Sequence, residues 1–276
     1  MPFTPTHVAA VLPALPWLRR RFAGNRSVPA SALVIGSMIP DAGVFLPRVI
    51  DYWATHSVRG LFTLCLPLGM AAFLAWEYFV KAPLVDLAPE SVRARINRPR
   101  GTPQPPLTLR TLLWATGLIV LGAASHVLWD SFTHAGRWGV EALPILERVW
   151  FTLPEWAPLR HRAMPGYRLG QYGSTFVLLP VVGLYALVRL RRHEPVGEPR
   201  SAVPPAVRTA VLTAFVLLPL AAAGRAAWAS LPHNNMRILL VRAVTSAGVT
   251  LVIAVVAYAA AHAALARRGR RERSGG

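Results

Sequence analysis

Long apolar stretches alternate along the chain with short polar connectors that are rich in arginine. Five stretches have the length of roughly 17–25 residues that lets a helix cross a bilayer. They are Leu61–Val80, Thr111–Thr133, Tyr172–Val188, Thr209–Trp228 and Ala243–Leu265. Two earlier stretches, Pro5–Leu18 and Val28–Pro47, are interrupted by prolines, which break or kink helices. The pattern predicts an all-α polytopic membrane helix bundle with six or seven membrane segments, some of them short or broken.

The composition agrees with a membrane protein and excludes an ordinary soluble domain. Of the 276 residues, 54% are hydrophobic and only 15% are charged, and the mean hydropathy is +0.40. The single cysteine, Cys65, excludes an internal disulfide and a cysteine metal cluster.

The connectors divide the chain into four predicted parts. Residues 1–190 are expected to form a membrane domain that holds a metal site, with an outer loop at residues 135–170. A basic linker at 191–208, a C-terminal transmembrane hairpin at 209–265 and a basic, disordered tail at 266–276 follow. Within the first part, the proline-rich connector Lys81–Arg110 is expected to be extended.

The net charge of +18 is concentrated in the connectors and the tail, where it acts as a topology signal. We therefore expect membrane lipids as partners and no nucleic acid. Four basic segments hold 20 of the 30 Lys and Arg residues if all four are cytoplasmic: residues 19–26, the two long connectors and the tail. The positive-inside rule then predicts a multi-pass membrane protein with its N-terminus outside and its C-terminus in the cytoplasm.

The candidate chemistry begins with the sequence S-H-V-L-W-D-S-F-T-H-A-G at Ser125–Gly136. A spacing of four places His126 and Asp130 on one helix face, and His134 lies about 80° around the axis from His126. Ionisable groups at the end of an apolar run are costly and normally mark function. Two simpler interpretations stay open. His126 and Asp130 could be a polar pair that joins helices, and His134 could be a residue that the helix C-terminus favours.

The predicted topology places further ionisable groups at the same depth, in the outer half of the membrane. Asp41 lies at the Pro40 break, where it could instead cap a half-helix. His56, in Thr-His-Ser, could instead be an ordinary interfacial histidine. We expect five groups to converge, with His134 as a sixth: His7, Asp41, His56, His126 and Asp130. Imidazole and carboxylate are good ligands for zinc, manganese or iron, and bound metals would acidify a water and stabilise a displacement at phosphorus.

These residues lie in four motifs: Thr-Pro-Thr-His7, Gly36-Ser-Met-Ile-Pro-Asp41, Thr-His56-Ser with Gly60, and Ser125-His126 through Asp130 to Gly136. Over residues 2–139 they resemble a bacterial inner-membrane family of metal-dependent hydrolases, and more narrowly a branch known as a domain of unknown function. Their order is also similar to the all-helical zinc-dependent phospholipase C and nuclease superfamily. The resemblance implies that all five residues are metal ligands, with Asp41 bridging. The phospholipases have a later His-x-x-x-Glu pair that this chain lacks, so one or two ions are expected rather than three.

The favoured prediction is a membrane-embedded zinc-dependent hydrolase of a phosphoester, from a lipid or an envelope metabolite, at the outer face. Asp41 and Asp130 are the candidate catalytic residues. Five arginines either hold the phosphate or are plain interfacial residues: Arg59, Arg137, Arg160, Arg162 and Arg168. One alternative is a proton- or ion-coupled transporter. Another is a structural protein with a degenerate site, whose ligand residues would not meet within about 5 Å.

Overall fold

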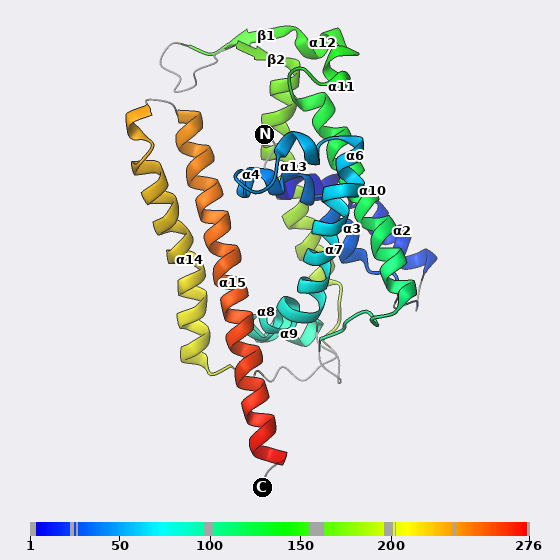
Figure 1. The fold of residues 1–276 in the computed structure, drawn as a ribbon, viewed down its shortest axis with the longest axis vertical. Coiled ribbons are helices and arrows are strands. Elements are labelled where there is room, and N and C mark those ends of the chain that lie inside the picture. Colours follow the sequence, from blue (N-terminus) through cyan, green and yellow to red (C-terminus); the bar gives the residue numbers. More distant parts are fainter. Residues whose placement is uncertain are drawn as a thin grey trace. The chain divides into compact units, whose positions relative to one another are not determined.

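The computed structural model describes residues 4–22, 25, 27–96, 102–154, 163–195, 201, 203–233 and 236–274, and it is nearly all helical (Figure 1). Contacts divide the chain into two units. The first comprises Met1–Phe73 and Pro105–Arg189, and the second comprises Leu74–Gln104 and Leu190–Gly276. Residues 74–104 therefore group with the C-terminal hairpin, although the sequence led us to expect them in the metal-site domain.

Five helices in the described part of the chain are long and apolar enough to cross a membrane. They are Val58–Leu87, Leu109–Thr133, Gly166–Arg191, Pro205–Trp228 and Ile238–Ala266. Each contains one of the five long apolar stretches of the sequence, which confirms the predicted helical membrane bundle. The apolar parts of the last three helices are largely exposed, as is required of surfaces that contact lipid.

The first unit begins with short helices and ends with long ones. Its N-terminal elements are η1 (Thr4–His7), α1 (Val8–Val11), α2 (Ala14–Arg21), α3 (Ala30–Gly36), η2 (Ile39–Asp41), α4 (Ala42–Phe45), α5 (Tyr52–Thr55), α6 (Val58–Gly60), the π-helical η3 (Leu61–Cys65) and α7 (Leu66–Ala75). Its later elements are α10 (Leu109–Thr133), α11 (Trp138–Glu141), α12 (Pro144–Glu147), β1 (Val149–Thr152), β2 (Ala163–Pro165) and α13 (Gly166–Arg191). The two N-terminal apolar stretches are thus short and broken, as their prolines predicted.

Local signals explain where the site-bearing helices begin and end. Thr108 caps α10, because its side chain accepts a hydrogen bond from the Thr111 backbone N–H at 3.2 Å. Asp51 caps α5 in the same way, because its carboxylate accepts a hydrogen bond from the backbone N–H of Trp53 at 2.8 Å. After α10, Gly136 has a φ of +67°, a conformation that glycine adopts readily, and there the chain turns away from the helix axis.

Helices α3 and α10 pack at very short range, and this contact forms the centre of the first unit. Gly36 of α3 lies against the backbone of Ile119, and Gly122 of α10 lies against the backbone of Leu33 and Ser37. Small residues at such a crossing let two membrane helices approach closely. The contact brings the end of α3 beside the buried face of α10, where His126 and Asp130 lie.

A small hairpin occupies part of the loop at residues 135–170, for which no regular structure was predicted. Strands β1 and β2 pair antiparallel, with Val149 opposite Pro165 and Thr152 opposite Ala163. The register shifts between Val149 and Phe151. This sheet is a minor exception to the all-α fold.

The second unit contains η4 (Trp76–Val80, π-helical), α8 (Lys81–Leu87), α9 (Glu90–Ile96), α14 (Pro205–Trp228), η5 (Leu231–His233) and α15 (Met236–Ser274). Helices α14 and α15 pack together as the predicted hairpin. The first half of the Lys81–Arg110 connector is helical rather than extended, and His262 of α15 pairs with Asp86 of α8 at 3.1 Å. Helix α15 continues to Ser274, so the basic tail is helical as far as this residue, where we expected disorder.

Candidate metal centre

His126 and Asp130 lie one turn apart on α10, with exposed side-chain fractions of only 0% and 2%. The carboxylate Oδ2 of Asp130 is 3.6 Å from Nε2 of His126. This is the same-face arrangement that the spacing of four predicts. The pair supplies one wall of the centre, and the other groups come from elements far away in the sequence.

Asp41 reaches the centre from the break between α3 and α4. Helix α3 ends at Gly36, and the turn η2 around Pro40 places the Asp41 carboxylate with Oδ1 at 3.6 Å from His126 Nε2. Thr4 Oγ1 donates a 2.7 Å hydrogen bond to the other oxygen, Oδ2. Asp41 makes no capping hydrogen bond to α4. Its carboxylate therefore serves the centre rather than the half-helix that follows.

Two more histidines approach the Asp130 carboxylate from the N-terminal part of the unit. His56 follows α5 and has its Nε2 3.4 Å from Asp130 Oδ2. His7 ends η1 and has its Nε2 3.5 Å from Asp130 Oδ1. The His7 ring also stacks on His126, with ring centroids 3.6 Å apart. Asp130 therefore lies between three imidazoles.

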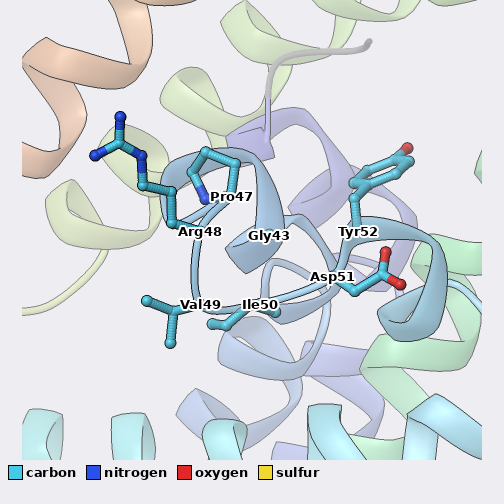
Figure 2. Close-up of a pocket in the computed structure, with 7 residues that line it drawn as sticks. All are labelled: Gly43, Pro47, Arg48, Val49, Ile50, Asp51 and Tyr52. Carbon is cyan, nitrogen blue, oxygen red and sulfur yellow. The ribbon is translucent and has the colours of Figure 1, made fainter.

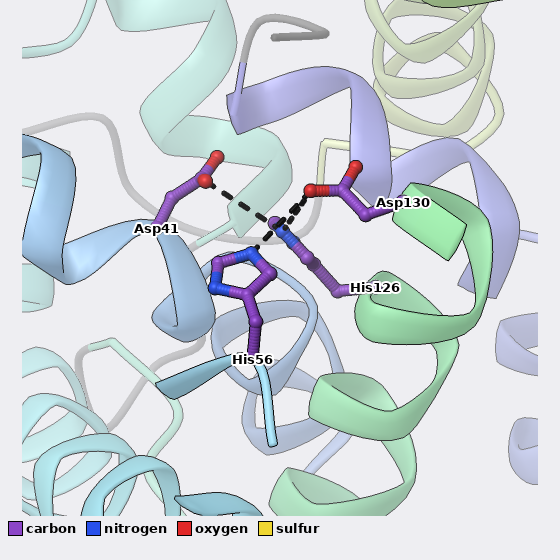
Figure 3. Close-up of side chains that lie close together, drawn as sticks. All are labelled: Asp41, His56, His126 and Asp130. Atoms are coloured by element: carbon purple, nitrogen blue, oxygen red, sulfur yellow. Dashed lines mark ion pairs between the residues drawn. The ribbon is translucent and has the colours of Figure 1, made fainter. Parts of the chain in front are cut away.

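Figure 3 shows four of these side chains directed at a common point. One ligand atom from each of Asp41, His56, His126 and Asp130 lies within 4.8 Å of all the others. The alternative of a structural protein with a degenerate site predicted that these residues would not meet within about 5 Å, which differs from the observed arrangement. The separations of 3.4–3.6 Å between paired atoms compare with the edge of roughly 3.4 Å of a tetrahedron whose metal–ligand bonds are about 2.1 Å.

Backbone carbonyl groups hold two of the imidazoles in one tautomer. Nδ1 of His126 donates to the carbonyl oxygen of Ser37 at 2.8 Å, and Nδ1 of His56 donates to that of Tyr52 at 2.8 Å. With the proton on Nδ1, the lone pair of each Nε2 points into the centre. A histidine that binds metal normally has its other nitrogen held in this way.

Several polar atoms at the centre are buried and have no hydrogen-bond partner within the described part of the chain. They are Nδ1 and Nε2 of His7, Oδ1 of Asp41, Nε2 of His56, Nε2 of His126 and Oδ1 of Asp130. Burying polar atoms without partners costs about 1–3 kcal/mol each. A divalent cation would satisfy the lone pairs that face the common point, so the residues present fit a metal.

A family model described as Domain of unknown function (DUF4184) matches residues 1–260. The chain belongs to this family. The match continues far beyond residue 139, includes every predicted ligand, and agrees with the expected domain of unknown function. Searches of curated proteins and of solved structures found no match. Since the family description names no reaction, the function has to be argued from the site.

His134 lies at the edge of the centre and uses both ring nitrogens. Its Nδ1 donates to the Asp130 carbonyl at 3.2 Å, and its Nε2 accepts from the Gln171 amide at 3.1 Å. Burial lowers the pKa of His134 to about 4, so the ring is neutral near pH 7 and suits one donated and one accepted bond. Nδ1 is also 3.6 Å from Asp130 Oδ1. As ligands, His134 and His7 both stay predictions, since both lie outside the group of four.

Tyr52 is a neighbour of the centre that was not among the predicted site residues. Its hydroxyl donates to Asp130 Oδ2 at 3.4 Å, and its ring lies 4.0 Å from the His56 ring. Burial raises the pKa of the Tyr52 phenol above its ordinary value, with smaller contributions from Asp130 and Asp41. The hydroxyl therefore stays protonated near pH 7 and can donate a hydrogen bond. Its spacing of four before His56 was the available sequence signal.

The arginines expected at the outer mouth have other contacts. Arg137 lies over the ring of Trp53 at 4.7 Å, and Arg168 donates to the carbonyl of Ala163 at 2.8 Å. Arg59 is exposed on α6. Arg160 and Arg162 fall outside the described residues. A phosphate-binding role for these arginines stays a prediction.

Replacing Thr4 with valine is expected to weaken metal binding about tenfold. The change keeps the side-chain shape but leaves Oδ2 of Asp41 without its hydrogen bond, and lost outer contacts typically cost about 10–100-fold in metal affinity. Zinc titration against a competing chelator measures the change. Thr63→Val is the matched control, because the Thr63 hydroxyl bonds only to a backbone carbonyl on an exposed helix turn. Equal affinities in the two variants would contradict the role of Thr4.

Proposed function

We propose that the protein is a membrane-embedded, metal-dependent hydrolase that acts on a phosphoester at the extracytoplasmic face. The observation that carries the proposal is the convergence of buried, unpartnered imidazole nitrogens and carboxylate oxygens from separate elements of the first unit. Without a ligand, such a cluster would not stabilise the fold. Apolar side chains in its place would avoid the free-energy cost of burying polar atoms without partners.

The donor set favours zinc and allows one or two ions. Three imidazoles and two carboxylates, without cysteine, suit zinc best and also suit manganese or iron. When bound, a divalent metal acidifies a water and stabilises the charge that develops in a displacement at phosphorus. The burial of the centre strengthens these electrostatic effects, because little water screens them.

The two carboxylates of the centre, Asp41 and Asp130, differ in their surroundings. Thr4 occupies Oδ2 of Asp41, so only Oδ1 is available to a ligand or to a proton taken from water. Asp130 lies between His7, His56 and His126, with its carboxylate oxygens 3.4–3.6 Å from their Nε2 atoms, so a cation held by these rings would also lie beside the Asp130 charge. Asp41 and Asp130 are therefore our candidates for the proton-accepting groups.

The arrangement of arginines supports an outward-facing centre in the inner membrane. With the basic connectors and the C-terminus in the cytoplasm, the C-terminal end of α10 lies at the outer face, and the centre is there. A phosphorylated lipid or an envelope metabolite would be available at this depth. The resemblance to zinc-dependent phospholipases supports the same class of substrate.

The test is metal content and hydrolysis in the purified, detergent-solubilised protein. We expect one or two equivalents of zinc by elemental analysis, and cleavage of p-nitrophenyl phosphate or of bis(p-nitrophenyl) phosphate. A chelator should abolish cleavage, and added zinc should restore it. A protein without stoichiometric metal would refute the centre. A metal-loaded protein that cleaves neither ester would refute the hydrolase and leave the centre standing.

A further inference from the structure

The loop between α10 and α13 exposes an unusual number of large apolar side chains. Five of them, each 45–58% exposed, lie on α12 and β1 or at their ends, and we call them the loop patch: Leu143, Ile145, Val149, Trp150 and Phe151. Contiguous apolar surface of this kind marks a contact with a membrane or with another protein. The loop patch therefore calls for a partner, and the metal centre does not use it.

The exposure of β1 differs from that of an ordinary strand. Side chains of a strand alternate between two faces, and usually one face is buried. All four residues of β1 are exposed, whereas Met164 and Pro165 of its partner β2 are buried. Strand β2 is thus the inner strand and β1 the outer one. Among the described residues, nothing covers either face of β1.

The loop patch is attached directly to the start of a membrane span. Strand β2 ends at Pro165, and α13, which is long and apolar enough to cross a membrane, begins at Gly166 (Figure 1). The Gly166 N–H donates to the carbonyl of Arg148 at 3.1 Å, and a Cβ at Gly166 would lie 2.8 Å from the carbonyl oxygen of Ile145. Helix α12 therefore packs against the first turn of the span, which holds the loop patch at the membrane boundary.

A second segment at this end of α10 also exposes apolar side chains. It joins α4 to α5, and its Val49 is 81% exposed beside a pocket of about 450 Å³ that Gly43 and residues 47–52 line (Figure 2). The exposed ring of Trp53 on α5 lies under Arg137, which follows the end of α10 by four residues. Apolar exposure on two separate segments fits the plane of a membrane better than one protein partner.

The backbone and the charges of the loop indicate its depth. The sheet has only two strands in the described part of the chain, so one edge of β1 has no strand beside it. The hydrocarbon core does not tolerate such an edge, and it does not favour the neighbouring charges of Glu147 and Arg148. The headgroup region accepts both, and Trp is enriched there. The indole N–H of Trp150 already donates to the carbonyl of Ile145 at 3.4 Å, so the ring can enter this region without an unpaired donor.

We propose that α12 and β1 lie in the headgroup region of the leaflet that α13 enters, with the loop patch in contact with lipid. The loop is then a monotopic element between two spans rather than a hairpin surrounded by water. In the predicted topology this leaflet is the outer one. The inference goes beyond the proposed function, because it requires neither a metal nor hydrolysis.

The experiment measures the depth of nitroxide labels by electron paramagnetic resonance in the full-length protein. Buried Cys65 is replaced by serine, and single cysteines are introduced in the loop patch as Ile145→Cys and Phe151→Cys. The protein is reconstituted into vesicles of phosphatidylcholine and phosphatidylglycerol. Each label's collisions are compared for oxygen, which concentrates in the bilayer, and for a nickel complex, which stays in water. The references are Phe176→Cys, on the exposed surface of α13, and Glu194→Cys, exposed beyond the other end of α13.

We expect oxygen-to-nickel collision ratios at both loop sites that are several-fold higher than at Glu194→Cys and lower than at Phe176→Cys. Ratios equal to that of Glu194→Cys would place the loop in water and overturn the proposal. Ratios equal to that of Phe176→Cys would place it in the hydrocarbon core, which also contradicts the proposal. Protection from both reagents would show that a second copy or another protein covers the patch. The two sites lie on different elements, so if one variant fails to fold, the other still gives the depth.

Discussion

Asp130→Asn is expected to strip the metal from the centre and leave the fold intact. The Asp130 carboxylate lies within 3.4–3.6 Å of imidazole nitrogens from His7, His56 and His126, so it is the charge that all three share. Asparagine has the same shape and no charge. Its amide N–H groups would donate to the Nε2 lone pairs that otherwise face a metal, so the variant satisfies the buried histidines without an ion.

The loss of metal affinity in Asp130→Asn should exceed the range of about 10–100-fold that is typical when a residue that only supports a metal ligand is changed. Elemental analysis should find background metal. Added zinc should raise the melting temperature of wild-type protein but not that of the variant, because only a ligand that binds the folded state stabilises it. His126→Ala is expected to lose metal as well.

Asp51→Asn is the control for Asp130→Asn. Asp51 lies one residue before Tyr52, and its carboxylate is exposed and caps α5, a role that asparagine performs about as well. This variant should keep its metal. Unchanged metal content in Asp130→Asn would show that the cluster is only a buried polar contact between helices.

Much of the site was predictable because ionisable residues are rare and costly in apolar segments. His126 and Asp130 stand at the end of an uninterrupted apolar run, and Asp41 stands at a proline break, so their polarity alone marks them. Both patterns are local in the chain. The depth of each residue then followed from the spacing of the arginine clusters, which placed His7 and His56 at the same level before any contact was known.

The contacts that complete the centre could not be predicted, because they depend on how the helices cross. The carbonyl of Ser37 orients His126, and a backbone carbonyl carries no side-chain signal. Gln171 reaches His134 from a helix that begins about 30 residues later. The helices α8 and α9 were missed for a different reason: prolines later in the same connector, such as Pro103, dominated its composition.

Gly122→Ala is the second change from which we expect a large effect, although no atom of Gly122 belongs to the centre. A Cβ at this position would overlap the carbonyl oxygen of Leu33 and would lie 2.7 Å from the backbone N of Ser37. Backbone atoms cannot rotate away, so α3 must move from α10. The movement would carry the Ser37 carbonyl away from His126 Nδ1, which it now holds at 2.8 Å.

The cost of this overlap, about 1–3 kcal/mol for an overpacked contact, outweighs the gain in helix propensity of up to about 1 kcal/mol. Gly117→Ala on the same helix is the matched control, because no atom outside its own helix lies within 4 Å of a Cβ there. We expect Gly117→Ala to raise the melting temperature slightly and to keep zinc. Gly122→Ala should lower the melting temperature and weaken zinc binding at least tenfold. Equal zinc affinity in the two variants would show that the α3–α10 contact does not position the ligands.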